Sequence, residues 1–193
     1  MRLNECRKIV YWGNYFTTMD LITELAELAI ATRLKRLSDR LAYDVNKIYK
    51  ELNLNFESKW YLVLELLNRR SMLSIVDVAE ELKLTHPAIV QYVDQMLNAK
   101  LIIAHKDSTD GRKRLVSLAP DGKKLLDDLS PILSILREEV SGWLNEADCN
   151  LLSTLGQLEK TLEDRSLYQR LKGQLQYGSK NSANELSAQE REA

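Results

Sequence analysis

The order of elements between Ser74 and Leu118 constrains the fold more than any other feature of the sequence: two short helices, then a pair of strands with a basic tip. The first helix should begin after Ser74, whose hydroxyl can accept a hydrogen bond from a free backbone N–H, with Asp77 as its capping-box partner. Its apolar residues follow helical spacing on one face, namely Ile75, Val78, Ala79 and Leu82. We therefore predict a short amphipathic helix that ends in a turn at Lys83 and Leu84.

The second helix should begin at Thr85, a good N-cap residue, with Pro87 in its first turn, where proline is tolerated. Its predicted buried residues are Ile89, Val93 and Met96. Its opposite face carries the polar and small side chains His86, Val90, Gln91, Asp94 and Gln95. An amphipathic second helix after so short a turn is typical of a helix-turn-helix.

After Lys100 the sequence changes to strand spacing, with Leu101, Ile102 and Ile103 leading to His105 and Lys106. A second strand, Arg114 to Leu118, mirrors the first, and residues 107–112 between them are dense in turn formers. Gly111 can adopt the positive φ of a hairpin tip. Helix, turn, helix and hairpin in this order predict a winged helix-turn-helix, a fold that reads DNA.

The predicted hairpin tip is charged in a way that suits DNA. Arg112, Lys113 and Arg114 lie beside Asp110, whose carboxylate can hold one guanidinium in a fixed orientation. An arginine held in this way is preorganised for the negative potential of a narrow minor groove. The residues that we expect to contact DNA are Thr85, His86, Val90, Gln91, Gln95, Lys106, Asp110, Arg112, Lys113 and Arg114.

The formal net charge of −1 hides an uneven distribution of charge along the 193 residues. Residues 1–98 carry 13 basic and 13 acidic side chains, residues 99–124 carry 7 and 3, and residues 125–193 carry 7 and 12. The basic excess therefore coincides with the predicted hairpin, as expected of a surface that faces phosphates. Because this excess is modest, useful affinity for DNA should require two subunits.

From roughly Leu21 to Leu171 the chain resembles the MarR family of bacterial transcriptional regulators. The resemblance is strongest in the string from Ile89 to Met96, in Leu101-Ile102, and in the wing from Asp110 to Arg114 with Val116-Ser117-Leu118 behind it. It implies a homodimer in which each subunit places one helix in a major groove and one wing in a minor groove of a pseudo-palindromic operator. It also implies repression of transcription by occupying a promoter, relieved by a small-molecule effector.

Three positions depart from the family pattern. Val90-Gln91 stands where the family often has Ser-Arg, Lys100 where it tends to have Gly, and Ala119 where it tends to have Thr. Glutamine can bridge an adenine and valine can contact a thymine methyl group, so we expect an A·T-rich half-site. The changes at Lys100 and Ala119 weaken local helix caps.

Apolar stripes at helical spacing flank the predicted winged region. A long helix that begins near Asp20 should carry Leu34, Leu37, Leu41, Val45, Ile48 and Leu52. A second should carry Leu125, Leu129, Ile132, Leu136, Val140 and Trp143, with a kink at Ser130-Pro131. A third stripe, Leu151, Leu155, Leu158 and Leu162, has heptad spacing, which favours a partner helix.

We therefore predict a mainly α protein, a winged helix-turn-helix with a small β-hairpin wing and long dimerisation helices at both ends. The expected segments are an N-terminal helical dimerisation segment at 1–52, the DNA-binding domain at 53–119, C-terminal dimerisation helices at 120–172, and a flexible tail at 173–193.

Two hypotheses concern the control of DNA binding. Tyr43, Trp60 and Tyr61 could line the crevice where ligands often enter in the family, which suggests a small aromatic effector, although for each one alone an ordinary core aromatic is the favoured interpretation. Alternatively, Cys6 could sense oxidants, because its basic neighbours Arg2, Arg7 and Lys8 favour a thiolate. Cys149, beside a leucine stripe, is expected to be inert.

Other classes of function find little support in the sequence. We see no nucleophile elbow, no phosphate-binding glycine loop and no metal-ligand spacing, and His86 and His105 are too far apart to argue for a metal pair, so we expect no enzyme, cofactor or metal. Without a long apolar run or a signal-peptide pattern, we expect a cytoplasmic protein that does not enter a membrane. The serious alternative is a helical dimer whose winged surface binds another protein.

Overall fold

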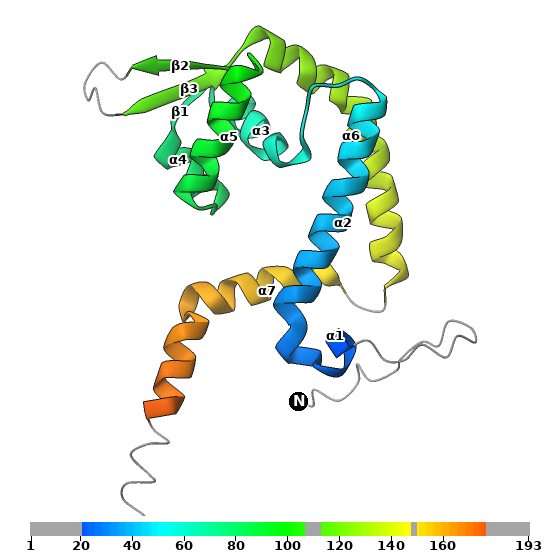
Figure 1. Ribbon diagram of the computed structural model, residues 1–193, viewed down its shortest axis with the longest axis vertical. Helices are drawn as coiled ribbons and strands as arrows, with labels where there is room; N and C mark the ends of the chain where they lie inside the picture. The colour runs from blue at the N-terminus through cyan, green and yellow to red at the C-terminus, as the bar shows by residue number, and fades with distance from the viewer. Residues whose placement is uncertain (1–20, 107–112, 148–149, 177–193) are drawn as a thin grey trace, which may run out of the picture. The chain divides into compact units, whose positions relative to one another are not determined.

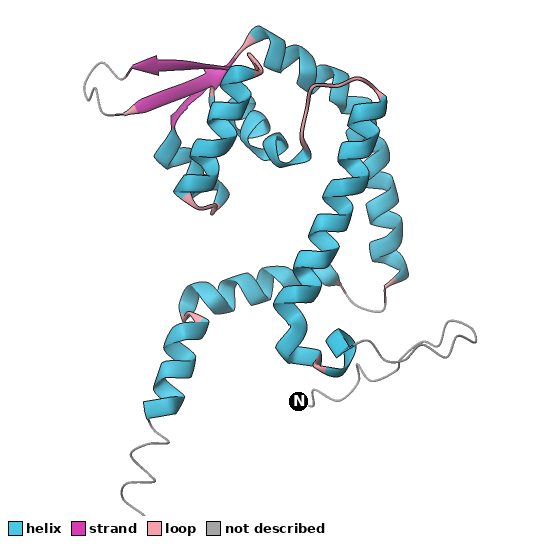
Figure 2. Ribbon diagram, in the orientation of Figure 1, coloured by secondary structure: helices cyan, strands magenta, loops and turns pink. Residues whose placement is uncertain are grey.

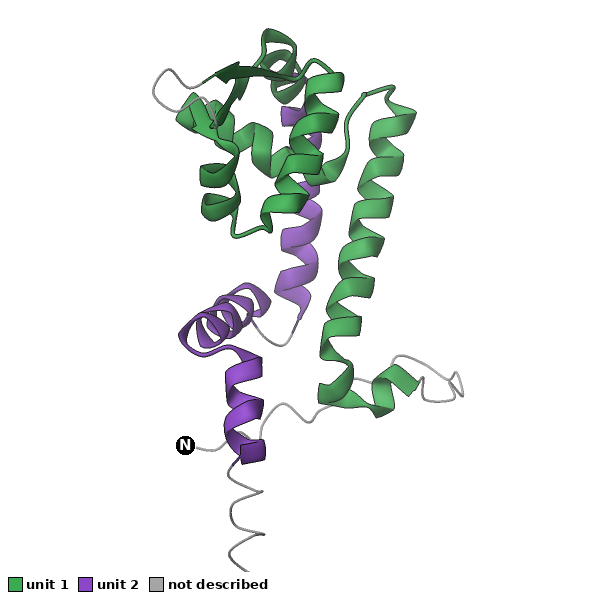
Figure 3. Ribbon diagram, turned by 60° about the vertical axis from the view of Figure 1, so that its left-hand side comes forward, with its two compact units in different colours: residues 1–127 green, residues 128–193 purple. Residues whose placement is uncertain are grey.

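The computed structural model describes residues 21–106, 113–147 and 150–176. In chain order the helical elements are α1 (Leu21–Glu24), the 3₁₀ turn η1 (Ala26–Ala29), α2 (Ile30–Glu51), the 3₁₀ turn η2 (Ser58–Trp60), α3 (Tyr61–Arg70), α4 (Ile75–Leu82), α5 (His86–Asn98), α6 (Pro120–Glu146) and α7 (Leu151–Asp164) (Figure 1). Residues 167–176 are also helical. The chain divides into two units, residues 1–127 and 128–193, and the boundary falls within α6 (Figure 3).

The strands β1 (Met72–Ser74), β2 (Ile102–Lys106) and β3 (Arg114–Leu118) form one antiparallel sheet in the order β1-β3-β2 (Figure 2). The predicted hairpin strands are confirmed. Strand β1 was not predicted, because three residues are too few to show an alternating pattern.

Helices α4 and α5 form the predicted helix-turn-helix. The Ser74 hydroxyl accepts a hydrogen bond from the Asp77 backbone N–H at 3.1 Å, and the Asp77 carboxylate accepts one from the Ser74 N–H at 3.2 Å, which completes the capping box. Lys83 ends α4 in the left-handed conformation, with φ 53°. Thr85 is the N-cap of α5, but its side chain makes no capping hydrogen bond.

The core of the winged region is apolar and receives side chains from α3, α4, α5 and β3. Its fully buried members include Val63, Leu64, Leu67, Val78, Ile89, Val93, Met96 and Val116. The predicted buried stripe of α5 is thus confirmed. Because that stripe is buried in the core, the opposite face of α5 is the one that can contact a partner.

The end of α5, the start of β2 and the start of α6 meet at Leu101. The Leu101 N–H donates to Met96 and the Lys100 N–H to Leu97, a Schellman closure in which Lys100 has φ 60°. The Leu101 carbonyl accepts a hydrogen bond from the Ala119 N–H at 3.0 Å, and a Cβ on Gly122 would overlap that same carbonyl oxygen. These contacts fix the hairpin relative to α5.

The N-terminal helix differs from the prediction. Instead of one helix from near Asp20, which lies outside the described residues, a turn with Ala26 at φ 44° separates α1 from α2. The predicted apolar stripe of α2 is mostly exposed within the single chain, as at Leu34, Leu37, Leu41, Ile48 and Leu52. By contrast, Tyr49 on the same helix is 1% exposed and packs edge-on against Phe56, with ring centroids 5.1 Å apart.

The second unit is helical. Helix α6 continues through Pro131, and the expected kink at Ser130-Pro131 stays a prediction. The Asn150 side chain caps α7 by accepting from the Ser153 N–H, and the heptad residues Leu158 and Leu162 are exposed. Residues 173–176, predicted as part of the tail, belong to the last helical segment, whereas 177–193 lie outside the described residues.

None of the helices in the described ranges is long and apolar enough to cross a lipid bilayer.

Candidate nucleic-acid interface

The N-terminal half of α5 presents the expected base-reading side chains. Thr85, His86 and Gln91 are exposed and Val90 is half-buried. Pro87 occupies the first turn, and the partial positive charge of a helix N-terminus attracts phosphate. This end of α5 therefore has both the exposure and the polarity needed to enter a groove of DNA.

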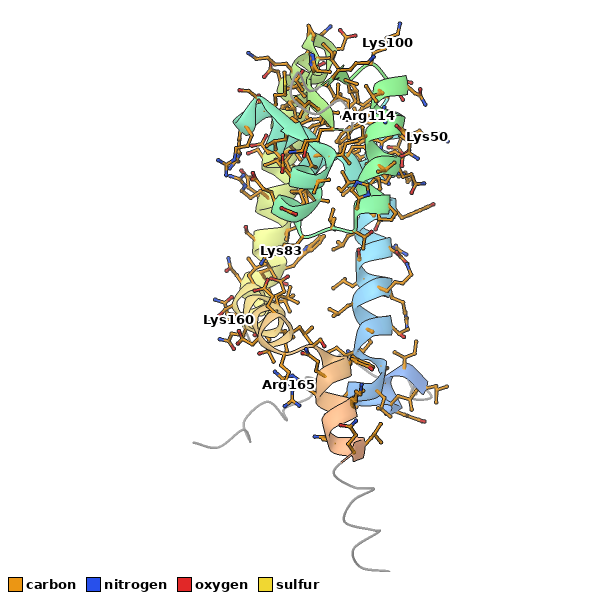
Figure 4. All side chains as sticks on the ribbon, turned by 90° about the vertical axis from the view of Figure 1, so that its left-hand side faces the viewer. Lys50, Lys83, Lys100, Arg114, Lys160 and Arg165 are labelled. Carbon is orange, nitrogen blue, oxygen red and sulfur yellow. The ribbon has the colours of Figure 1, made fainter. Side chains whose placement is uncertain are left out.

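An ion pair connects α5 to the hairpin. The Arg114 guanidinium donates to the Asp94 carboxylate at 2.8 Å, and the two side chains are 44% and 52% exposed. Arg114 is labelled in Figure 4. Pairs as exposed as this contribute little to stability. The charge-assisted hydrogen bond instead orients the guanidinium at the base of the wing.

The base of the wing concentrates positive charge. Lys106 and Arg114 are direct partners in the register of β2 and β3, and Lys113 is exposed beside them. Like charges directly opposite each other on a sheet are unfavourable unless an anion lies nearby. Among the described residues of this cluster, Asp94 supplies one negative charge for three cations, which favours an anionic partner. The remaining predicted wing contacts, Asp110 and Arg112, lie outside the described residues.

Asp94 lies on the exposed face of α5, as predicted, but its partner Arg114 was not predicted. Twenty residues separate Asp94 from Arg114, so no local spacing could pair them. A carboxylate on a helix face expected to approach phosphates was nevertheless a signal, because such a charge needs a cation nearby.

Gln95 has a different environment from the other predicted base readers. Its side-chain oxygen accepts a hydrogen bond from the Trp60 indole N–H at 3.1 Å, and the contact is partly buried. The spacing of residues in the sequence could not predict the pair of Trp60 and Gln95 either, because 35 residues separate the two positions.

The three aromatic residues proposed to line a ligand crevice have three different environments. Trp60 is 5% exposed and packs edge-on against Phe56, whereas Tyr43 on α2 is 66% exposed. Tyr61 is half-buried and close enough to Tyr49 to add to the effect of burial, which is the main cause of the raised pKa of the Tyr49 phenol. Trp60 is thus a core residue, and a crevice formed by all three stays a prediction.

The two histidines lie on different elements, α5 and β2. His86 is exposed at the start of α5, and a His105 ring nitrogen lies 2.8 Å from the Ser117 hydroxyl across the sheet. Within the described ranges no three His, Cys, Asp or Glu side chains are grouped so as to hold a metal ion. Cys6 and Cys149 lie outside those ranges.

Helix α2 carries a run of basic residues that is consistent with a solvated helix face, namely Arg33, Lys35, Arg36 and Arg40. Lys35 pairs with Asp39 and Arg40 with Asp44, each at 3.0 Å and one helical turn apart. These pairs reduce the charge available for DNA on that face.

No family model matches the chain. Among solved structures, the chain is similar to a mutant of MarR from E. coli in complex with operator DNA, with a TM-score of 0.57 and 17% identity over 74% of this chain and 98% of that one. It is also similar to the PcaV transcriptional regulator from Streptomyces coelicolor in complex with its natural ligand, with a TM-score of 0.57 and 19% identity over 74% and 96% of the two chains. A third is MepR from S. aureus in complex with DNA, with a TM-score of 0.56 and 17% identity over 70% and 97%.

The fold is therefore a winged helix-turn-helix, mainly helical with a small three-stranded sheet. More narrowly, it is the winged-helix fold of MarR-like regulators.

Proposed function

We propose that this protein is a sequence-specific DNA-binding regulator of transcription and not an enzyme. The observation that carries the proposal is the cation cluster of Lys106, Lys113 and Arg114 at the base of the wing. This cluster is joined to the exposed face of α5 through Asp94. Simultaneous contact with two grooves of DNA requires a helix that reads one groove and a cationic wing held next to it. Two proteins of the same fold were solved in complex with DNA, which supports the same assignment.

We further propose that the regulator acts as a homodimer on a pseudo-palindromic operator. The exposed leucines of α2 and α7 are consistent with a surface that a second copy covers. Dimerisation would place two α5 helices about one turn of DNA apart and double the number of cations that face phosphates.

The finer parts of the proposal concern regulation. The protein would repress transcription from within the cytoplasm by occupying a promoter, and a small aromatic effector would release it by changing the separation of the two α5 helices. PcaV, which has the same fold, was solved in complex with its natural ligand, and this supports a ligand-responsive mechanism here. Oxidation of Cys6 is the alternative trigger, and titration with peroxide that left DNA affinity unchanged would exclude it.

The alternative function, a helical dimer that binds another protein through its winged surface, is less well supported. Lys106 and Arg114 are exposed and lie directly opposite each other in the register of β2 and β3, a placement suited to phosphates. A protein-binding scaffold would show neither affinity for duplex DNA nor a strong dependence on salt.

Selection from a random pool of duplex DNA tests the proposal. We expect enrichment of a pseudo-palindrome with A·T-rich half-sites about one helical turn apart. Enrichment of G·C-rich half-sites would refute the expected readout by Val90 and Gln91 but keep the proposed function. Recovery of no enriched sequence would favour the protein-binding alternative.

A further inference from the structure

The turn η2 touches two helices at once. Its first residue, Ser58, donates its backbone N–H to the Asn46 side-chain oxygen of α2 at 2.7 Å. Its last residue, Trp60, donates its indole N–H to the Gln95 side-chain oxygen of α5 at 3.1 Å. Between them, the Lys59 ammonium lies 5.7 Å from the centre of the Tyr92 ring, also on α5.

The contact with α2 is a cap supplied from outside the turn. Glu57, the N-cap residue of η2, makes no side-chain capping hydrogen bond. The Ser58 N–H is instead satisfied by Asn46, which lies 12 residues earlier in the chain and is partly buried with it. A half-buried N–H left without this partner would be unfavourable, so the position of the turn depends on α2.

The contacts with α5 hold the helix at two points. Tyr92 and Gln95 are three residues apart, so they lie on one side of α5, and Gln91 and Asp94 precede them directly. The indole of Trp60 is itself fixed in the core against Phe56, with ring centroids 6.1 Å apart. A rotation of α5 about its axis would therefore break the hydrogen bond between Trp60 and Gln95.

We propose that η2 is a positioning link between α2 and α5, in which Asn46 holds the turn and Trp60 sets the orientation of α5 through Gln95. Gln95 is then a positioning residue and not a base reader. Bidentate recognition of adenine requires both the oxygen and the nitrogen of a glutamine side chain, and the Gln95 oxygen is already engaged. The inference rests on the proposed function, because the orientation of α5 matters only if α5 reads DNA.

The test compares affinity for the duplex selected by the wild-type protein with affinity for a scrambled duplex. Trp60→Phe keeps an aromatic ring against Phe56 but removes the N–H donor. We expect the ratio of the two affinities to fall about three- to tenfold, the effect of one hydrogen bond, with little change in affinity for the scrambled duplex. Gln95→Met, which removes the acceptor at a partly exposed position, should give the same fall even if Trp60→Phe does not fold.

Conservative variants distinguish a loss of the orientation of α5 from a general loss of structure. Gln95→Glu keeps an acceptor for the indole and should retain most of the ratio, although its charge weakens binding to both duplexes. The double variant Trp60→Phe/Gln95→Met should be no worse than either single variant, since one hydrogen bond is lost in all three. At the other end of the link, Asn46→Asp should preserve the ratio and Asn46→Leu should lower it.

A fall in the ratio with Gln95→Met but not with Trp60→Phe would overturn the inference and make Gln95 a base reader. An unchanged ratio in both variants would also overturn it while leaving the proposed function intact. A wild-type protein that selects no duplex would reject the proposed function, and the inference with it.

Discussion

At Lys100 the backbone adopts a conformation that suits glycine. Its φ of 60° closes α5 and turns the chain into β2, and a side chain in this region is strained by about 1 kcal/mol. Lys100→Gly should therefore raise the free energy of unfolding by about 0.5 kcal/mol, after the greater flexibility of glycine in the unfolded chain is allowed for. Denaturant unfolding measures this change.

Lys100→Val is the matched control, because a β-branched residue tolerates positive φ poorly and should lower stability by about 1 kcal/mol. A loss of stability in Lys100→Gly would contradict the assignment of strain to this position.

Gly122 lies where the start of α6 approaches β2. An added Cβ would overlap the Leu101 carbonyl oxygen and lie 2.9 Å from a Leu118 methyl carbon, so Gly122→Ala should destabilise the fold by about 2 kcal/mol. Gly142 and Gly156 serve as controls, since an added Cβ there meets nothing within 4 Å. Alanine at either control position should raise the melting temperature, because both positions are helical. Equal effects at all three positions would refute the close packing at Leu101.

At the scale of elements, the wing and α5 should act together on DNA. Arg114→Gln removes a guanidinium held by Asp94, and it should weaken binding to the selected duplex about tenfold and make the dependence on salt less steep. Anisotropy titrations at several salt concentrations measure both effects.

The melting temperature of Arg114→Gln should hardly change, because the ion pair is exposed. Arg69→Gln is the matched control, since Arg69 also forms an ion pair, with Glu65 on α3, but is not one of the expected DNA contacts and should not affect binding. Equal losses in the two variants would contradict a specific role for Arg114.

The sequence predicted elements where local chemistry decides them. The capping box of Ser74 and Asp77, the buried stripe of α5 and the strands of the wing all follow from spacing within a few residues. The short strand β1 and the break at Ala26 leave no periodic signal. The pairs that build the candidate site, Asp94 with Arg114 and Trp60 with Gln95, depend on tertiary packing and could not be predicted from spacing.

At the scale of the molecule, a stripe of leucines on α2 is exposed in the part of the chain that the structure describes. Leu34, Leu37 and Leu41 are 45%, 51% and 38% exposed, and a groove of about 600 Å³ is lined partly by Leu34 and Leu37. If a second copy covers this stripe, Leu37→Glu should convert the dimer to a monomer and abolish tight DNA binding, because it would bury a charge in the interface. Sedimentation equilibrium measures the change in mass.

Lys50→Glu is the control on the same helix, because Lys50 is exposed and lies off the stripe. It should leave the mass of a dimer unchanged. A wild-type protein that sediments as a monomer would contradict the proposed dimer.

The salt dependence of binding to the selected duplex, measured by fluorescence anisotropy for the wild type and for Arg112→Ala, tests the central claim most directly. If two subunits bind as proposed, each with the three cations of the described wing base, the logarithm of the association constant should fall with the logarithm of salt concentration at a slope of about −5. Arg112→Ala should weaken binding by about 1–3 kcal/mol. Binding that is insensitive to both salt and Arg112→Ala would contradict the assignment of this protein as a DNA-binding regulator.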